Sequence, residues 1–153
     1  MMQQETRIVI WPHARAMQSF SERFWGLLRQ PEPSYSQAFW FPRCRAIHTY
    51  GMKAPIDVLA VDRQLRIISV TRHLSPGRSY RFKGAYGIIE LSALAPWPLE
   101  HWIGQPLIFL SQGERCDATT QLPVDSFFNI AIEPVTECLS GNSGADSSAI
   151  SGL

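Results

Sequence analysis

The sequence predicts an α+β domain: a mainly antiparallel, curved or barrel-like β-sheet with one packed amphipathic helix and a short helical turn. Short apolar segments recur along the chain between Pro, Gly and polar residues, a pattern typical of strands. Only residues 14–28 place apolar side chains at helical spacing. With 153 residues, of which 45% are hydrophobic and 18% charged, the chain suits one domain with its own core.

The first predicted elements are a strand and the helix. Residues 6–11 form an apolar, β-branched segment that ends at Pro12, which predicts a strand. In residues 14–28 the spacing of the apolar side chains predicts a helix that packs one face on the sheet. That face consists of Met17, Phe20, Phe24, Leu27 and Leu28. Residues 30–37 are rich in Pro and Ser and predict a loop.

The later predicted elements are short strands and one helical turn. We expect extended segments on both sides of Pro42, and a hairpin in which residues 63–66 turn between two apolar strands. Residues 99–103 predict a helical turn that ends at Gly104. The predicted strands of this part are residues 38–41, 46–50, 56–61, 67–73, 85–91 and 106–110.

The predicted globular domain spans residues 6–111. Residues 112–138 have no clear pattern, and we interpret them as a peripheral extension. Residues 139–153 are rich in Ser and Gly and lack bulky apolar side chains, which predicts a disordered tail. We expect a monomer or a small homo-oligomer.

Charge and cysteine content exclude several classes of protein. A net charge of +1 makes nucleic acid an unlikely partner, because a dedicated nucleic-acid surface usually needs a basic excess. Three widely spaced cysteines argue against a disulfide scaffold and against a zinc finger. No segment resembles a secretory leader or approaches the ~18 apolar residues of a membrane span. We therefore expect a cytoplasmic protein without a membrane span. Phosphate-loop and metalloprotease motifs are absent, and we predict no cofactor.

Several motifs match those of a known family. Arg23 precedes Gly26-Leu-Leu-Arg29, residues 39–41 are aromatic, and Pro55-Ile-Asp57-Val leads into an apolar strand. On these motifs, residues 6–111 resemble the uncharacterised domain-of-unknown-function family 192. The resemblance implies a compact, mainly β fold and an accessory role linked to secretion or pilus assembly. Residues 48–52 differ from the Trp-Met-Lys-Asn-Thr of much of the family, which implies a branch with its own site.

The segment from Cys44 to Val58 concentrates reactive side chains. Cys44, His48 and Met52 recur at intervals of four, so a strand would place these soft ligands for Cu(I) or Zn(II) on one face. Strand positions four apart are separated by ~13 Å, which makes a shared metal the weakest hypothesis. The alternative is that Cys44 and Met52 fill the core and that His48 is a structural, hydrogen-bonded residue.

Asp57 interrupts an apolar strand. It lies on the same face of that strand as Leu59 and Val61, where a carboxylate needs a partner or a function. One hypothesis makes Asp57 and His48 an acid–base pair, with Cys44 as a candidate nucleophile. The alternative is that Asp57 caps backbone N–H groups at the turn after Pro55.

Residues 71–83 form the most basic segment and could bind an anionic ligand. Glu90, inside another apolar strand, is expected to meet a cation from this segment. The aromatic residues 39–41 could line a groove for a carbohydrate or another small molecule. The alternatives are that the basic segment is a solvated loop and that these aromatic residues belong to the core. The candidate binding residues are His48, Thr49, Asp57, Trp40, Arg72, Arg78, Arg81 and Glu90.

These features favour a small, non-enzymatic binding or accessory module whose partner is an unknown small molecule or protein. The expected site is a pocket around His48, Thr49 and Asp57 with the basic segment at its rim, because polar groups gather there without a complete catalytic motif. The alternative function is a small hydrolase or transferase that uses His48 and Asp57 as an acid–base pair.

Overall fold

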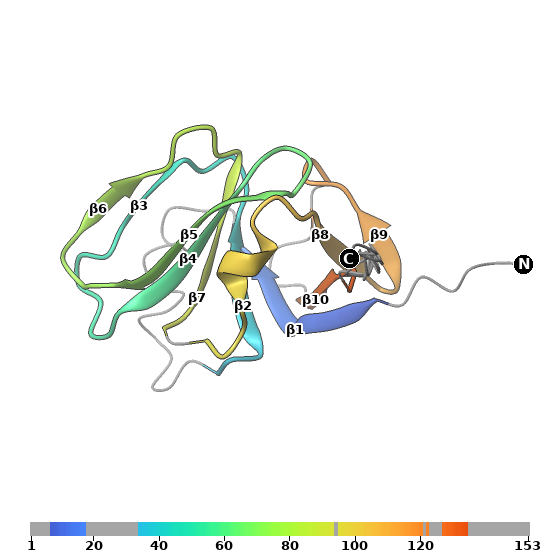
Figure 1. Ribbon diagram of the computed structural model, residues 1–153, viewed down its shortest axis with the longest axis horizontal. Helices are drawn as coiled ribbons and strands as arrows, with labels where there is room; N and C mark the ends of the chain where they lie inside the picture. Colours follow the sequence, from blue (N-terminus) through green and yellow to red (C-terminus); the bar gives the residue numbers. More distant parts are fainter. Residues whose placement is uncertain (1–6, 18–33, 94, 121, 123–126, 135–153) are drawn as a thin grey trace, which may run out of the picture.

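The computed structural model describes residues 7–17, 34–93, 95–120, 122 and 127–134, and these residues form a mainly β fold (Figure 1). The elements are β1 (Ile8–Ala16), β2 (Gln37–Phe41), β3 (Ala46–His48), β4 (Ile56–Val61), β5 (Ile67–Leu74), β6 (Ser79–Arg81), β7 (Gly87–Ser92), the 3₁₀ turn η1 (Leu99–Trp102), β8 (Leu107–Ser111), β9 (Glu114–Cys116) and β10 (Phe127–Ile132).

Eight strands form one sheet in the order β5-β4-β7-β2-β1-β10-β8-β9, and β3 pairs with β6 in a separate two-stranded sheet. β1 and β2 run parallel, whereas the other neighbours in the large sheet are antiparallel. A bridge between Arg66 and Pro106 joins the residues that precede β5 and β8. The sheet is mixed because it contains this one parallel pair. It is open because the outer strands β5 and β9 do not pair with each other.

The predicted α+β class is wrong. The sheet is open and mixed rather than barrel-like, and among the described residues the only helical element is η1, at the position predicted for a helical turn. Residues 14–16, the start of the predicted helix, belong to β1 instead. β1 continues past Pro12 because the pairing register with β10 shifts between Trp11 and Ala14, so proline avoids a ladder position that needs an N–H donor. Residues 18–28 of the predicted helix lie outside the described residues.

β4 separates the two parts of the hydrophobic core, and all six of its residues are buried. Alternate side chains of a strand point to opposite faces. Leu59 and Val61 accordingly join one cluster, whereas Val58 and Ala60 join a second. The first cluster also contains Trp11, Trp40, Phe109 and Phe128.

The pair β3–β6 covers the second cluster. Ile47 of β3 and Phe82, the residue after β6, are buried in that cluster. In Figure 1 this pair lies at one end of the molecule and β8 and β9 lie at the other. We call residues 45–53 and 78–83, which include these two strands, the β3–β6 ribbon.

The chain after residue 111 contributes to the large sheet. β10, which falls within the segment interpreted as a peripheral extension, lies between β1 and β8. The tail predicted to be disordered, residues 139–153, lies outside the described residues. Within the described part of the chain, no helix is long and apolar enough to cross a membrane.

Candidate functional site

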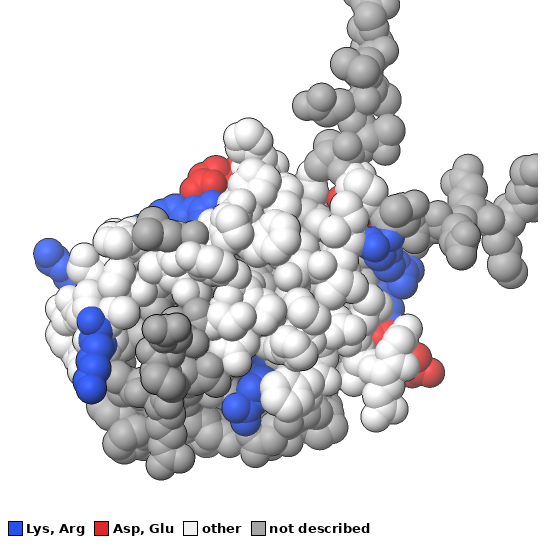
Figure 2. Space-filling model, turned by 90° about the horizontal axis from the view of Figure 1, so that it is seen from below, with Lys and Arg blue, Asp and Glu red and all other residues white. Residues whose placement is uncertain are grey.

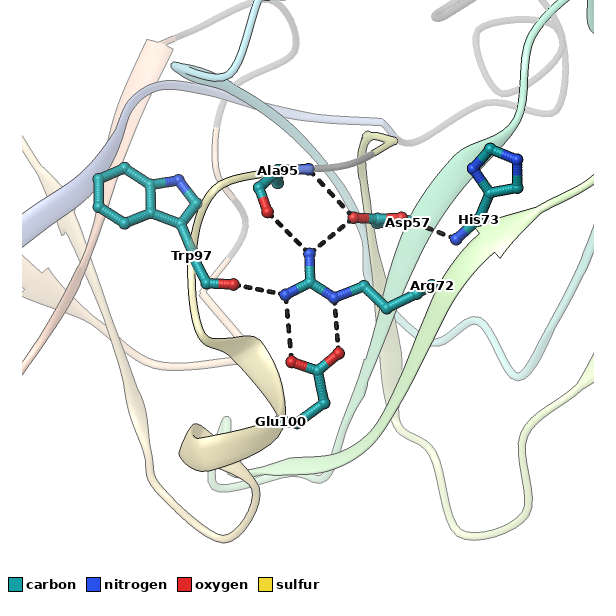
Figure 3. A network of polar contacts seen from close by, with 6 residues as sticks. All are labelled: Asp57, Arg72, His73, Ala95, Trp97 and Glu100. Carbon is teal, nitrogen blue, oxygen red and sulfur yellow. Dashed lines mark hydrogen bonds and ion pairs between the residues drawn. The ribbon is translucent and has the colours of Figure 1, made fainter.

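Asp57 is fully buried on β4 and accepts three hydrogen bonds (Figure 3). Its Oδ1 accepts from the backbone N–H of His73 at 2.8 Å. Its Oδ2 accepts from Nη1 of Arg72 at 2.9 Å and from the backbone N–H of Ala95 at 3.3 Å. The carboxylate therefore has the cation and the hydrogen-bond donors that a buried charge requires.

The guanidinium of Arg72 connects Asp57 to the segment that contains η1. Its Nε and Nη2 bind the two carboxylate oxygens of Glu100 at 2.7 and 3.1 Å. Its Nη1 and Nη2 also donate to the backbone carbonyls of Ala95 and Trp97. Figure 3 shows this guanidinium between both carboxylates and both carbonyls. The network holds residues 95–100 against β4 and β5.

Hydrogen bonding within the network lowers the pKa of Glu100, the exposed carboxylate. Arg72 lowers the pKa of Glu100 from its usual 4.5 to about 2, mainly through the side-chain hydrogen bonds and with a smaller contribution from a backbone N–H. The bond to Glu100 is also the main cause that raises the pKa of Arg72, with a further contribution from Asp57. Both groups therefore stay charged over the physiological pH range.

The structure does not join His48 to Asp57. His48 is exposed on β3, and its ring stacks on Tyr50 with a centroid distance of 5.6 Å. None of the hydrogen bonds of Asp57 involves His48 or Cys44. Cys44 is buried, and its thiol donates to the carbonyl of Ala46 at 3.1 Å. The described residues contain no group of three or more His, Cys, Asp or Glu side chains that could hold a metal ion.

Thr49 is buried and fixes one end of the β3–β6 ribbon. Its hydroxyl donates to the carbonyl of Ser75 at 2.7 Å and accepts from the N–H of Arg78 at 3.0 Å. Its own N–H donates to the carbonyl of Arg78 at 2.8 Å, and its carbonyl accepts from Gly77 at 3.0 Å. Thr49 therefore joins the end of β3 to the loop before β6.

The other predicted binding residues are dispersed. Arg78 and Arg81 are exposed in the ribbon, and Arg81 lies opposite Ala46 in the pairing of β3 with β6. Glu90 is half-buried on β7, between β2 and β4. Trp40 is buried on β2 in an edge-to-face contact with Phe109.

A cavity of about 500 Å³ opens beside Trp40. Segments distant in the sequence form its wall: the end of β1, the turn after β2, the β4–β5 turn, the residue before β7 and the segment after β9. A second cavity of about 430 Å³ shares Arg63, Ala118 and Thr119 with the first, so the two adjoin. The polar and aromatic residues that line the first cavity are Trp40, Arg43, Arg63, Tyr86, Thr119 and Thr120.

The described wall of the first cavity carries positive charge. Arg43 and Arg63 line it, and none of its described lining residues is Asp or Glu. The guanidinium of Arg63 lies over the ring of Tyr86, 5.7 Å from the ring centroid, which fixes its position by a cation–π contact. Arg43 has φ of 52°, a left-handed backbone conformation that is uncommon for residues other than glycine.

Sequence reasoning identified one residue of this cavity, Trp40, and missed the others. Neither cavity is lined by another predicted binding residue. A signal for Arg63 was present, since a cation in a tight turn between two apolar strands should face outward. Thr119 and Thr120 carried no signal, because only the folded topology brings the segment after β9 to β2.

Comparisons with known proteins show a fold but no family. No protein-family model and no curated protein matches the chain. A proposed transcription regulator from Sinorhizobium meliloti 1021 has a similar structure, with a TM-score of 0.52 and 16% identity over 60% of this chain and 76% of that one. A protein of unknown function from Novosphingobium aromaticivorans DSM 12444 aligns with a TM-score of 0.47 and 15% identity over 53% of this chain and 63% of that one. At such identities, the first likeness shows the fold alone.

Proposed function

We propose that the protein is a small binding module for an anionic small molecule with a planar ring, and that the cavity beside Trp40 is its binding site. The observation that carries the proposal is that Arg43 and Arg63 both line a wall that has no described carboxylate. Two guanidinium groups without a carboxylate partner in the same wall favour an anion.

The other lining groups match the rest of such a ligand. Thr119 and Thr120 supply hydroxyl groups that both donate and accept hydrogen bonds. Trp40 and Tyr86 supply aromatic surface. A volume of about 500 Å³ falls in the range of pockets that bind small molecules, ~300–1,000 Å³.

Other parts of this proposal rest mainly on the sequence. We place the protein in the cytoplasm, since Cys44 and Cys116 are free thiols. Membership of family 192 and an accessory role in secretion or pilus assembly are proposals that follow from the motifs around Arg29 and Asp57.

Calorimetric titration of the full chain tests the proposal. The probe is phenyl phosphate, which combines a ring with an anion, and its neutral counterpart is benzamide. We expect phenyl phosphate to bind and benzamide to bind much more weakly. Arg63→Gln should weaken the binding of phenyl phosphate about tenfold or more, because a charge-assisted hydrogen bond is lost.

Arg66→Gln is the matched control, because Arg66 is an exposed cation from the same turn that lines neither cavity. This variant should bind phenyl phosphate as the wild type does. Equal affinity of Arg63→Gln and Arg66→Gln, or equal affinity of the wild type for phenyl phosphate and benzamide, would overturn the proposal.

A further inference from the structure

The β3–β6 ribbon concentrates positive charge. Its cations are Arg45, Lys53, Arg78, Arg81 and Lys83, and all five are exposed. Residues 43–56 and 73–89, which contain the ribbon, have no Asp or Glu. Because the whole chain has a net charge of +1, the residues outside the ribbon have a net charge of −4. The small net charge of the chain therefore results from a positive ribbon and a negative remainder.

The space-filling view agrees with this distribution. Figure 2 shows Lys and Arg side chains projecting at its left end, and no Asp or Glu is visible there. This is the end at which β3 and β6 lie in Figure 1, since the two views differ by a rotation about the horizontal axis.

One face of the ribbon packs on the core and the other faces solvent. Ile47 lies opposite Tyr80, and its side chain is buried. Since neighbouring strand residues point to opposite faces, His48, Ser79 and Arg81 share the outer face. His48 and Arg81 are exposed there.

The outer face has an ordered aromatic platform beside its cations. The rings of His48 and Tyr50 stack with an interplanar angle of 27°. The hydroxyl groups of Tyr50 and Ser79 lie 3.2 Å apart in a hydrogen bond, which ties the platform to β6. Tyr50 is 54% exposed, so a further flat ring can contact it. The hydrogen bonds of Thr49 hold the adjacent backbone in place.

We propose that the outer face of the β3–β6 ribbon binds single-stranded nucleic acid. Exposed aromatic rings stack on unpaired bases, while surrounding cations bind the phosphates. A duplex offers its phosphates but keeps its bases stacked inside, so it would use only the cations. An anionic membrane would use the same cations but would not need the stacked pair. This surface is distinct from the cavity beside Trp40, because none of its cations lines that cavity.

Fluorescence anisotropy with a labelled oligothymidylate of about 15 nucleotides tests this proposal. We expect binding that weakens with salt and exceeds binding to a duplex of equal length. Arg81→Gln should reduce the slope of log affinity against log salt concentration by about 0.7, the value for one phosphate contact on a single strand. Arg115→Gln, an exposed cation on β9, is the matched control and should leave the slope unchanged.

Tyr50→Leu separates stacking from charge, because it removes the ring, with its hydroxyl bond to Ser79, and alters no charge. It should weaken binding to the oligothymidylate about tenfold and leave binding to the duplex unchanged. Sedimentation with phosphatidylserine vesicles provides the competing readout. No binding to the oligothymidylate, identical effects of Arg81→Gln and Arg115→Gln, or vesicle binding that exceeds oligonucleotide binding would each overturn the proposal. Arg63→Gln should not alter this binding, so the result is independent of the cavity.

Discussion

Arg72 on β5 and Asp57 on β4 form an ion pair in which Nη1 lies 2.9 Å from Oδ2. The carboxylate is fully buried, whereas the arginine side chain is 29% exposed and reaches Glu100 on its outer side. The pair thus joins the edge of the large sheet to the segment that contains η1. A buried carboxylate with backbone donors on both oxygens is suited to holding structure.

Replacement of Asp57 by Ala should therefore destabilise the fold. The change leaves Arg72 without its inner partner and two backbone N–H groups without an acceptor. We expect a loss of about 3 kcal/mol in the free energy of unfolding, measured by urea denaturation. Glu114→Gln, on an exposed position of β9, should change that free energy by less than about 0.5 kcal/mol. A stable Asp57→Ala variant would contradict the structural role.

Glu100 should give the protein an acid-sensitive contribution to stability. Its pKa is about 2 in the folded protein against a usual value of 4.5. A lowered pKa means that the contribution is present above pH 4.5 and is lost as pH falls toward 2. The difference in unfolding free energy between wild type and Glu100→Gln should therefore be constant above pH 5 and shrink through this window. The difference should be small, because the Glu100 side chain is 50% exposed. A difference that grows toward acid pH would contradict this assignment.

The strands could be predicted where the sequence signal is local. The hairpin of β4 and β5 was predicted from two apolar segments joined by a short turn, and both strands are confirmed. β10 was missed although five of its six residues are apolar, because β1 is distant in the sequence and no short turn joins β10 to β8. The helix prediction took residues 14–16 from β1, since spacing alone does not reveal that a register shift lets a strand continue past Pro12.

The candidate sites were predictable only in part. The sequence predicted that Asp57 needs a partner, because it interrupts an apolar strand, and the buried carboxylate does bind Arg72. The sequence did not identify Arg72 as that partner, because Arg72 was an equally good match for Glu90. The cavity depends on the meeting of segments around Arg43 and Thr119, and no local pattern reports such a meeting.

Gly87 should control the position of Trp40. A Cβ atom at residue 87 would lie 2.1 Å from Cη2 of the indole, so Gly87→Ala must displace the ring. We expect a loss of about 1–3 kcal/mol in stability, together with a shifted indole N–H resonance of Trp40 and weaker binding of phenyl phosphate. Gly84→Ala is the control: its added Cβ meets only Ile68 at 3.9 Å, although φ of +79° adds backbone strain. That variant should lose some stability without moving the Trp40 resonance, and a Trp40 resonance unchanged by Gly87→Ala would contradict the close packing.

Thr49 should control the order of the loop that precedes β6. Thr49→Val preserves the shape of the side chain but removes the hydroxyl, so the carbonyl of Ser75 and the N–H of Arg78 each lose a hydrogen bond. Because Thr49 is only 1% exposed, water cannot readily replace the hydroxyl, and we expect a loss of about 1–3 kcal/mol. Hydrogen exchange at the N–H of Arg78 should accelerate by more than the loss of global stability accounts for. Exchange at the N–H groups of β4 should accelerate only as much as that loss of global stability requires. Thr71→Val, at a half-buried threonine on β5, is the matched control and should leave exchange at Arg78 unchanged. Equal exchange at Arg78 in the two variants would show that the Thr49 hydroxyl does not hold the loop.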